Sequence, residues 1–358
     1  MKVTLVLDPY DEKHRSGLGR AAFKLTHAIV AAAPDTHFII ALKRTLAERP
    51  SFPGNNWEIC FASGGLFWLD EIARLTRDSN VHVFFTPVLP LWTHPKRSVV
   101  VVHDFAYRFF PNEGLGGFIR DTALAFLQRR ALRAATDVVA VSDATRTEAA
   151  LFSGRSTEDI AVIYNGVNDL CISAASQTIA KDSYFLLGGG IKERKNTLFA
   201  IEGYAVFVRT GGDEDLWVLG EPAGSYGAQV RARVKELGLA SRVRFLGYPS
   251  DTELAGLYRS TRAFIFPSVI EGFGMMPFEA ISCGAPVVYA DTPVLREVIG
   301  QGGLPVDPYD SETLGTALVA LANDDTLRAD LLSRGRACAA RYSWKKAGQE
   351  FACLLGVR

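Results

Sequence analysis

Residues 263 to 279 read Ala-Phe-Ile-Phe-Pro-Ser-Val-Ile-Glu-Gly-Phe-Gly-Met-Met-Pro-Phe-Glu, and this stretch decides the fold of the chain. An apolar strand comes first, then a loop that holds Gly272 and Gly274, then a helix. We expect the helix to open at about Pro277, because proline is well tolerated in a first helical turn. The two glycines allow a close approach of the backbone to a ligand, and the free N–H groups of a helix start attract anions.

Two carboxylates flank this loop, Glu271 before it and Glu279 after it, with seven residues between them. With a helical rise of about 1.5 Å per residue, the two carboxylates can border one ligand without contacting the same atom. An ordinary strand–turn–helix joint, with Glu279 favoured by the helix dipole, is the alternative for such a pair on its own. The residues around the pair favour a binding site.

The stretch from Phe266 to Val288 resembles the nucleotide-sugar site of the retaining GT-B glycosyltransferases of family 4. The resemblance implies an α/β protein of two Rossmann-like domains that face each other across a cleft. It assigns Glu271 to the donor sugar and Glu279 to the ribose hydroxyls of the nucleotide. The loop of Gly272, Phe273 and Gly274, with the following Met275, would bind the sugar and the pyrophosphate.

The composition sets outer limits on the class of protein. With 358 residues, the chain is long enough for two domains of ordinary size. Apolar residues make up 48% and charged residues 22%, which predicts a well-packed soluble protein. Basic and acidic residues balance at 39 each, so nothing in the net charge indicates a nucleic-acid partner.

The cysteines and the N-terminus bear on the location of the protein. Five cysteines are scattered and never form a C-x-x-C pair: Cys60, Cys171, Cys283, Cys338 and Cys353. We expect them to be reduced, buried thiols of a cytoplasmic protein, without a disulfide frame or a zinc site. The N-terminus reads as a first strand and not as a signal peptide, and no segment is apolar enough to span a membrane.

A glycine motif follows the first expected strand, at residues 3–7. The segment Gly17-Leu-Gly-Arg-Ala-Ala22 matches the G-x-G-x-x-A pattern of dinucleotide-binding proteins. However, nine residues separate it from the strand, and the next strand, 37–42, ends in Lys43-Arg44 instead of a ribose-binding acid. The family resemblance instead places Gly17 and Gly19 in a loop near the donor phosphates and the acceptor, before a helix over 20–33. A simple helix entry is the alternative.

A second candidate group in the N-terminal half follows the strand expected over 99–102. His103 and Asp104 stand at its carboxyl end, where open parallel sheets place their ligands. The pair resembles the family motif whose histidine approaches the donor sugar, while a surface turn is the alternative. Asp104, Tyr107 and Arg108 are then candidates for contacting the acceptor.

The helix expected over 117–135 is basic and amphipathic. Four arginines stand against the single acid Asp121, with large apolar residues between them. Such a helix can lie on an anionic membrane surface. A helix half-buried in its domain, with its arginines in water, explains the pattern nearly as well.

Further elements complete the N-terminal half. We expect strands over 81–85 and 137–142, the latter as the last strand of this domain, and helices over 67–75 and 144–151. Residues 160–168 resemble the family's strand into the interdomain linker, with Tyr164 in place of the usual proline. The first domain is therefore expected over residues 1–168 and the second over 169–342, with a linker over 168–182. The C-terminal helix, 343–358, is expected to pack back on the first domain.

The second domain opens with a glycine-rich, cationic loop. Gly188-Gly-Gly-Ile-Lys-Glu-Arg-Lys-Asn196 follows an expected strand and precedes a helix over 197–209. A departing pyrophosphate gains charge, and fixed cations with backbone donors stabilise it. The resemblance gives this role to Arg194 and Lys195, and it places Gly189 where many family members carry a further arginine.

Two further motifs concern the nucleotide base and metals. Tyr248 follows the strand expected from Val243 and is a candidate for contact with the base. Asp213-Glu-Asp215 matches the metal-binding D-x-D triplet of the other large glycosyltransferase fold. It reads as a solvated turn, because it follows two glycines and has no further ligand cluster beside it. No metal and no cofactor are therefore expected.

The resemblance implies an enzyme that moves a sugar from a nucleotide-sugar donor to an acceptor hydroxyl with retention of configuration. The residues of the two motifs around His103 and Arg194 look most like bacterial mannosyltransferases of surface-polysaccharide assembly. The expected donor is therefore GDP-mannose, and the acceptor a lipid-linked or other oligosaccharide at the cytoplasmic membrane face. UDP-glucose or another donor is an alternative. A nucleotide-sugar epimerase of the same fold and a sugar-binding protein without chemistry are further rivals.

Overall fold

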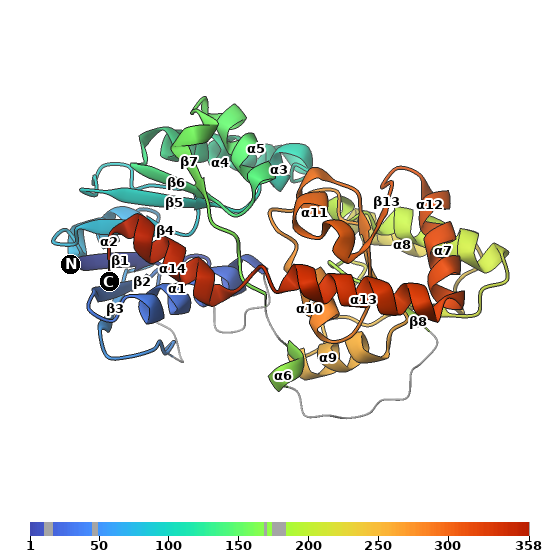
Figure 1. Cartoon of the computed structure of the whole chain (residues 1–358). Helices are drawn as coiled ribbons and strands as arrows, with labels where there is room; N and C mark the ends of the chain where they lie inside the picture. The colour runs from blue at the N-terminus through green and yellow to red at the C-terminus, as the bar shows by residue number, and fades with distance from the viewer. Residues whose placement is uncertain (11–16, 45–48, 168–169, 174–183, 358) are drawn as a thin grey trace. The chain divides into compact units, whose positions relative to one another are not determined.

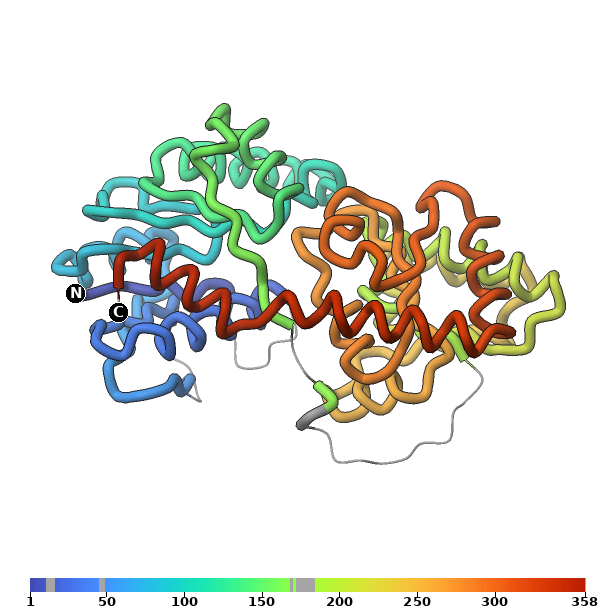
Figure 2. The backbone as a smooth tube through the Cα atoms, viewed as in Figure 1, coloured from blue at the N-terminus to red at the C-terminus, as the bar shows by residue number. Residues whose placement is uncertain are grey.

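The computed structural model describes residues 1–10, 17–44, 49–167, 170–173 and 184–357 (Figure 1). It divides into two compact units, one of Met1–Gly166 with Tyr342–Arg358 and the other of Val167–Arg341. The chain thus passes from one unit to the other after Gly166 and returns after Arg341 (Figure 2).

Unit 1 is built on a seven-stranded parallel sheet with the order β3-β2-β1-β4-β5-β6-β7. Its strands are β1 (Lys2–Val6), β2 (His37–Leu42), β3 (Trp57–Phe61), β4 (Val81–Phe84), β5 (Ser98–Val102), β6 (Asp137–Ala140) and β7 (Ile160–Val162). Its α-helices are α1 (Gly17–Ala32), α2 (Trp68–Leu75), α3 (Ala106–Phe109), α4 (Gly114–Ala134), α5 (Asp143–Ser153) and α14 (Trp344–Leu355), and Thr157–Asp159 forms a 3-10 turn.

The central strands of this sheet are buried along their whole length. Every residue of β4 and β5 is buried, which is the pattern of a parallel sheet covered on both faces. Val100 and Val102 of β5 belong to a core that also contains Leu132 of α4 and Ala149 of α5. The unbroken apolar runs therefore specify the centre of the sheet, and helices packed on it close the core.

The C-terminal helix α14 lies beside α1 in unit 1 (Figure 1). Gly348 permits the close contact, because a Cβ atom there would lie 2.3 Å from the Ala28 carbonyl oxygen. Arg97 anchors the end of the helix by donating to the carbonyl oxygens of Leu354 and Leu355, at 2.8 and 3.3 Å. The last residues of the chain thus complete the first unit.

Unit 1 differs from the sequence-based expectation at several places, among them the short helix α3, which was not predicted. Helix α1 begins at Gly17, so the two motif glycines lie in its first turn and not in a loop before it. Strand β3 was not predicted, since its sequence Trp-Glu-Ile-Cys-Phe is short and only half-buried at the sheet edge. The segment 137–142 is not the last strand, because β7 pairs with β6 and extends the sheet.

Unit 2 repeats the architecture with a six-stranded parallel sheet of order β10-β9-β8-β11-β12-β13. Its strands are β8 (Tyr184–Leu187), β9 (Asp215–Val218), β10 (Val243–Phe245), β11 (Phe264–Phe266), β12 (Val287–Ala290) and β13 (Leu304–Val306). Its α-helices are α6 (Leu170–Ser173), α7 (Thr197–Arg209), α8 (Gly224–Glu236), α9 (Asp251–Ser260), α10 (Met275–Ser282), α11 (Pro293–Val298), α12 (Ser311–Asn323) and α13 (Asp325–Ala339). Short 3-10 turns are η2 (Glu193–Lys195) and η3 (Gly300–Gly302).

The boundaries in unit 2 show how capping residues decide where helices begin. Helix α10 starts at Met275 and not at Pro277, because Gly274 in the left-handed conformation (φ 82°) ends the loop and caps the helix. Helix α9 is fixed by a capping box of Ser250 and Glu253. The helices α8, α12 and α13 were not predicted. Most of the expected linker over 168–182 lies outside the described residues; within it, Leu170–Ser173 form the short helix α6.

Candidate active site

The two motif loops of unit 2 follow neighbouring strands. Strands β8 and β11 pair in parallel at the middle of the sheet. From β8 the chain moves outward to β9 and β10, while β11 leads to β12 and β13 on the other side. This reversal of strand order opens a crevice at the carboxyl ends, where parallel α/β sheets bind their ligands. The loops with Arg194 and Glu271 both emerge at this point.

Hydrogen bonds join the two loops directly. The Val269 N–H donates to the Arg194 carbonyl oxygen at 2.9 Å, and the Ser268 hydroxyl donates to the same oxygen at 3.1 Å. In return, Arg194 Nη1 donates to the Ile270 carbonyl oxygen at 3.2 Å. Ser268 was not singled out from the sequence, although it lies inside the quoted stretch. Its position between the buried strand β11 and the carboxylate of Glu271 could have indicated a role in the site.

Lys195 and Glu271 form a buried ion pair between these loops, with Lys195 Nζ donating to Glu271 Oε1. Arg194 Nη1 lies 3.8 Å from the same carboxylate oxygen. Burial alone would raise the pKa of Glu271, but the charges of Lys195 and Arg194 and hydrogen bonds from Lys195 and Ser268 outweigh it and lower that pKa. Glu271 is therefore ionised at neutral pH, and the structure brings together three residues predicted for the site.

Glycine and aromatic neighbours hold the Lys195 side chain in place. Its ammonium lies 5.3 Å from the centre of the Phe266 ring, within range of a cation–π contact. Gly189, in the left-handed region at φ 100°, passes beside the lysine, so that a Cβ atom there would lie 3.1 Å from Lys195 Cδ. The glycine at the position of the family's extra arginine is thus accommodated by the backbone conformation and by the path of Lys195.

The glycine loop before α10 is fixed from both sides. A Cβ atom on Gly274 would lie 2.8 Å from Leu295 Cδ2, so both the space and the backbone angle require glycine. The Phe273 side chain is buried and packs against the Phe278 ring, with centroids 5.6 Å apart. The Phe273 side chain therefore belongs to the core of unit 2, whereas Met275, the first residue of the helix, is half-buried.

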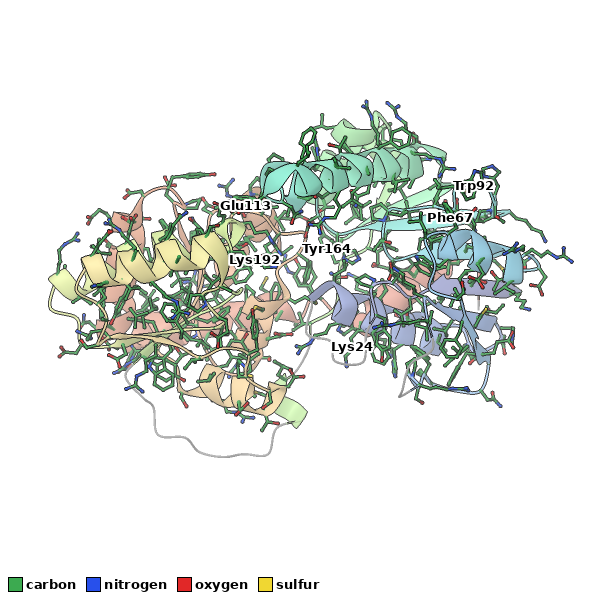
Figure 3. The ribbon with its side chains drawn as sticks, turned by 180° about the vertical axis from the view of Figure 1, so that it is seen from behind. Lys24, Phe67, Trp92, Glu113, Tyr164 and Lys192 are labelled. Atoms are coloured by element: carbon green, nitrogen blue, oxygen red, sulfur yellow. A yellow bond between two sulfur atoms is a disulfide. The ribbon has the colours of Figure 1, made fainter. Side chains whose placement is uncertain are left out.

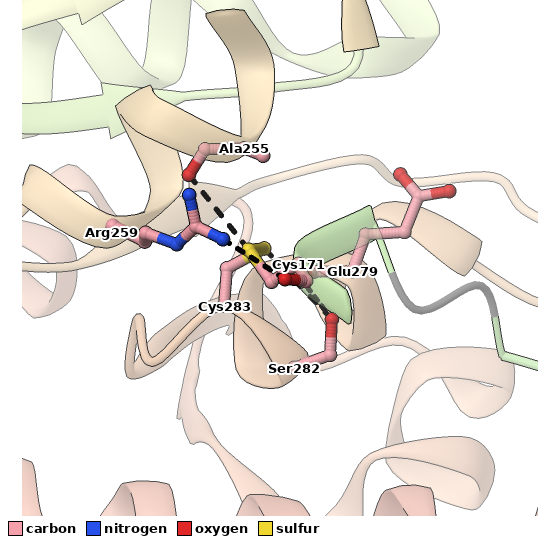
Figure 4. The surroundings of a disulfide bond; sticks show 6 residues. All are labelled: Cys171, Ala255, Arg259, Glu279, Ser282 and Cys283. Atoms are coloured by element: carbon pink, nitrogen blue, oxygen red, sulfur yellow. Dashed lines mark hydrogen bonds between the residues drawn. A yellow bond between two sulfur atoms is a disulfide. The ribbon is translucent and has the colours of Figure 1, made fainter. Parts of the chain in front are cut away.

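Glu279 lies in the second turn of α10 and is 3% exposed. Its carboxylate extends away from a disulfide bond at the other end of the helix (Figure 4). This bond joins Cys171 of α6 to Cys283, and Arg259 supports it by donating to the Cys171 carbonyl oxygen at 3.0 Å. The expectation of five reduced, buried thiols is therefore wrong for this pair, and Cys353 is exposed. Packing of α6 on α10 brings the two cysteines to a Cα–Cα distance of 5.3 Å, which their separation of 112 residues did not reveal.

Tyr248 stands on a loop at the same edge of this sheet. The loop follows β10, and Gly247 pairs with Gly220 after β9, whose N–H donates to the Gly247 carbonyl oxygen at 2.7 Å. Gly220 in turn touches Gly190, since a Cβ atom on it would lie 3.1 Å from Gly190 Cα. The Tyr248 side chain is 64% exposed. A row of three glycines thus connects the Tyr248 loop to the loop that carries Arg194.

In unit 1, His103 follows directly after β5, as expected. Burial lowers the pKa of His103 to about 4, against weaker opposing effects of the Asp104 charge and a hydrogen bond to the Phe85 backbone. The ring is neutral at physiological pH, and its Nε2 atom is buried without a hydrogen-bond partner among the described residues. A neutral imidazole that donates from Nδ1 keeps a lone pair on Nε2, which can accept a hydrogen bond from a hydroxyl.

The three residues proposed for acceptor contact differ in how exposed their side chains are and in the hydrogen bonds that they already form. Asp104 accepts a hydrogen bond from the Ala106 N–H at 3.0 Å and remains half-buried. The Tyr107 hydroxyl donates to Gln128 at 2.8 Å, and burial raises its pKa to about 12, so it stays protonated. Arg108 is exposed and stacks its guanidinium on the Phe152 ring at 4.4 Å. Of the predicted glycines, Gly17 is exposed at the start of α1 while Gly19 is buried.

The acids of the D-x-D triplet are largely engaged with arginines. Glu214 is 8% exposed and lies 3.5 Å from Arg262 Nε. Asp215 is the first residue of β9 and lies 3.3 Å from Arg242 Nε. Asp213 is exposed. The segment is thus a sheet entry with two structural ion pairs and one solvated acid.

The chain consists of two Rossmann-like units with parallel sheets. One of them carries two loops, cationic and glycine-rich, where its strand order reverses. This combination is that of the GT-B class of glycosyltransferases. Comparison with known proteins gives the family. Residues 16–169 match the model of "Glycosyltransferase Family 4", and residues 172–337 match that of "Glycosyl transferases group 1". The chain belongs to glycosyltransferase family 4.

Among the relatives, the chain is similar to the O-antigen chain mannosyltransferase RfbU of Salmonella typhimurium. They are 30% identical over 254 residues, which are 71% of this chain and 68% of RfbU. It is also 41% identical over 103 residues to O-antigen chain mannosyltransferase B of Escherichia coli, covering 29% of this chain and 27% of that protein. The serotype-specific mannosyltransferase WbdA of Escherichia coli is 26% identical over 275 residues, which are 73% of this chain but 33% of WbdA.

Solved structures show the same fold at low sequence identity. A sucrose-phosphate synthase from Thermosynechococcus elongatus superposes with a TM-score of 0.76 and 19% identity, covering 99% of this chain and 98% of that one. WaaG, a glycosyltransferase involved in lipopolysaccharide biosynthesis, gives a TM-score of 0.75 and 17% identity over 98% and 99% of the two chains. Among the described residues, no helix is both long and apolar enough to cross a bilayer.

Proposed function

We propose that this enzyme transfers mannose from GDP-mannose to a hydroxyl of an oligosaccharide acceptor in bacterial surface-polysaccharide synthesis. The observation that carries the proposal is the buried cluster of Arg194, Lys195 and Glu271 beside the glycine-capped start of α10. Two fixed cations and a helix N-terminus suit a diphosphate, and the adjacent carboxylate suits sugar hydroxyls. The choice of mannose rests on the similarity to RfbU and the other mannosyltransferases.

In this proposal Lys195 and Arg194 bind the diphosphate in addition to the Glu271 loop. An ammonium offers three donors and a guanidinium five, so Lys195 and Arg194 can keep their contacts with the Glu271 loop while binding phosphate oxygens. The backbone of Gly272 to Gly274 and Met275 would contribute N–H donors at the helix start. Glu279 would accept hydrogen bonds from the ribose hydroxyls, and Tyr248 would lie at the base.

The proposed reaction proceeds on one face of the sugar with retention of configuration. The bond between the anomeric carbon and the β-phosphate oxygen breaks, and a bond to the acceptor oxygen forms. The acceptor proton passes to the departing phosphate oxygen. Lys195 and Arg194 stabilise the charge that develops on the diphosphate, while Glu271 and the neutral His103 hold hydroxyls of the sugar. Gly17 and Gly19, at the start of α1, would adjoin the phosphates, and Asp104 and Arg108 would contact the acceptor.

The transfer is tested by incubating the enzyme with GDP-mannose labelled in the sugar, with and without an oligosaccharide acceptor. The proposal expects labelled oligosaccharide and GDP in equal amounts, and little GDP without the acceptor. An altered free sugar or a new nucleotide-sugar without acceptor would identify an epimerase instead. Transfer from UDP-glucose but not from GDP-mannose would keep the reaction and change the donor.

A lipid-linked acceptor at the cytoplasmic membrane face is part of the proposal. Its support is the exposed apolar surface of α4, where four large side chains are 59% to 76% exposed: Leu115, Phe118, Ile119 and Phe126. Arg120 and Arg129 are exposed on the same helix. Apolar side chains that insert into lipid, with cations that meet anionic headgroups, are typical of helices that lie on a membrane.

An exposed aromatic pair adjoins this helix. The rings of Phe67 and Trp92 are 4.5 Å apart and lie side by side at the surface (Figure 3). Arg130 of α4 donates to the carbonyl oxygens of Pro90 and Leu91, at 3.0 and 3.1 Å, which holds the Trp92 loop next to α4. Tryptophan is favoured at the membrane–water interface, because its ring is both apolar and polar.

Sedimentation with vesicles tests this attachment. We expect binding to vesicles rich in phosphatidylglycerol and weak binding to pure phosphatidylcholine. The change Phe126→Ser should reduce binding, whereas Leu151→Ser, at an exposed leucine on α5, should leave it unchanged. Equal loss in both variants, or no binding by the wild-type protein, would remove the membrane contact from the proposal.

We further propose that the transfer needs no metal ion. The support is the pairing of Glu214 with Arg262 and of Asp215 with Arg242, which occupies two acids of the D-x-D triplet. Transfer should therefore continue in EDTA at the same rate. A rate that EDTA abolishes and Mn²⁺ restores would contradict this.

A further inference from the structure

A polar pocket lies in unit 1, apart from His103 and from the residues assigned to the acceptor above. It has a volume of about 280 Å³ and is lined by Asp8, Tyr10, Leu42, Lys43, Arg44 and Gly64. These residues come at or just after the carboxyl ends of β1, β2 and β3, three strands that are neighbours in the sheet (Figure 1). Ligands of parallel α/β sheets bind at this edge.

Two adjacent cations give the pocket its charge. Lys43 lies over the ring of the buried Trp68, at 5.7 Å from its centre, which fixes the ammonium without neutralising it. Both Lys43 and Arg44 are exposed, and neither forms an ion pair or a hydrogen bond with another residue in the part of the chain that the structure describes. Exposed cations without a described ion-pair partner are available to an anion.

Asp8 and Tyr10 supply the hydroxyl-binding side of the pocket. Burial raises the pKa of Asp8, opposed by the charge of Lys43, and no described residue hydrogen-bonds its carboxyl group. The Tyr10 ring is held by stacking on Phe23, with centroids 5.6 Å apart. A carboxyl group and a phenol beside two cations form a set of donors and acceptors for a phosphate that is attached to a sugar.

The pocket shares its sheet edge with His103. The strand order β3-β2-β1-β4-β5 puts β1 two strand spacings from β5, and β2 three spacings from it. With β3 four spacings away and about 4.8 Å per spacing, the residues that line the pocket lie roughly 10 to 19 Å from the end of β5. A ligand that extends along the edge from His103 could reach the pocket through a short oligosaccharide.

We propose that this pocket binds a phosphoryl group of the acceptor, with Lys43 and Arg44 on the phosphate oxygens and Asp8 and Tyr10 on neighbouring hydroxyls. The inference rests on the proposed function for the identity of the acceptor, and it adds a specificity site for its anionic end. The phosphoryl group comes either from the diphosphate that links the oligosaccharide to its lipid or from a phosphate on the saccharide itself.

The first test requires no activity. Lysines of the full-length enzyme are acetylated at a limiting reagent concentration, with and without inorganic pyrophosphate, while GDP fills the donor site. Lys43 should be protected, whereas Lys96, exposed before the amino end of β5, should react equally in both samples. Equal reactivity of Lys43 with and without pyrophosphate, or equal protection of Lys96, overturns the proposal.

The second test compares two acceptors with the same oligosaccharide, one on a prenyl diphosphate and one on a neutral alkyl chain. Lys43→Ala should raise KM for the diphosphate acceptor about tenfold, the effect of one charge-assisted hydrogen bond. KM for the neutral acceptor and for the donor should not change. Lys96→Ala should leave KM unchanged for both acceptors and for the donor. Equal changes for both acceptors would contradict the proposal.

The two tests separate this inference from the proposed function. If Lys43→Ala raises KM only for acceptors whose saccharide itself carries a phosphate, the phosphoryl group belongs to the sugar, and the pocket assignment stands. If the wild-type enzyme transfers to both acceptors with equal KM, the pocket assignment is wrong while the transferase remains. If no transfer occurs from any donor, the proposed function is wrong, and the protection of Lys43 alone decides the pocket.

Discussion

Lys195 and Glu271 are 76 positions apart in the sequence and form one buried ion pair at the carboxyl ends of two adjacent strands. The pair joins the cationic loop after β8 to the glycine loop before α10. It sets the electrostatics of the site, because one carboxylate holds Lys195 directly and lies 3.8 Å from Arg194. Each motif is incomplete without the other, and the fold of unit 2 brings them together.

Removal of the Glu271 carboxylate should affect both stability and activity. In Glu271→Ala the buried Lys195 ammonium loses its partner, which we expect to cost about 3 kcal/mol in the free energy of unfolding. Adding Lys195→Met should recover most of this stability, since the buried, unpaired ammonium is then removed as well. Transfer should be abolished in both variants. Full activity in a folded Glu271→Ala enzyme would remove this residue from the mechanism.

Lys195 and Lys192 offer a matched comparison on one loop. Lys195 is buried beside Glu271, whereas Lys192 is exposed three positions earlier. Lys195→Ala should raise the barrier of the chemical step by about 3 kcal/mol, as expected for a lost donor to a developing charge. Lys192→Ala should leave kcat within twofold of wild type, or about 0.4 kcal/mol. Equal rates in the two variants would contradict the role of Lys195.

His103 predicts a pH dependence of stability. Its pKa is about 4 in the folded protein, against an ordinary value of about 6.5 in the unfolded chain. Between these two pH values His103 is protonated in the unfolded chain but neutral in the folded protein. The free energy of unfolding therefore falls as the pH drops from about 6.5 to 4. The contribution is up to about 3 kcal/mol.

Denaturant unfolding of wild type and His103→Gln at several pH values measures this contribution. His82, whose pKa burial also lowers to about 4, contributes in the same direction and remains in the variant. The variant should therefore lose less stability between pH 6.5 and 4 than wild type does. Parallel curves for the two proteins would mean that His103 is not held neutral.

The Cys171–Cys283 bond tests the cytoplasmic location. A disulfide that closes a loop of this length stabilises a fold by about 2 to 5 kcal/mol, so dithiothreitol should lower the melting temperature of the oxidised protein. Cys171→Ser should show no such response. If the enzyme is cytoplasmic, this bond forms only after the cell is opened, so alkylation at the moment of cell lysis should find both cysteines free. A bonded pair in that sample would contradict a cytoplasmic enzyme.

The grouping of Arg194, Lys195 and Glu271 was predictable, because these residues lie in two short contiguous motifs. The stretch around Glu271 and the loop around Arg194 each carried a recognisable order of strand, glycines and charged residues. Their pairing could be inferred only through the family, since sequence spacing does not show that β8 and β11 are neighbours. Ser268 was missed because its role depends on the Arg194 backbone, which is distant in sequence.

The failed expectations have physical reasons of the same kind. The Cys171–Cys283 bond depends on the packing of α6 on α10, and the short, half-buried β3 lacks the apolar run that marks a central strand. Helix α1 begins earlier than expected because Gly17 and Gly19 are accommodated in its first turn. The exposure of Phe118 and Phe126 could not be predicted either, because an amphipathic sequence does not show whether another element covers the apolar face of the helix.

The most direct test of a GDP-sugar transferase is thermal unfolding of the enzyme with GDP, UDP, ADP, dTDP or NADPH. A nucleotide at 100 times its dissociation constant stabilises the folded state by about 2.7 kcal/mol, which raises the melting temperature by degrees. We predict a rise with GDP alone, and a smaller rise in Lys195→Ala. A rise with UDP alone would keep the site and exclude GDP-mannose. A rise with NADPH alone would contradict the account, because the glycine motif after β1 would then be a dinucleotide site.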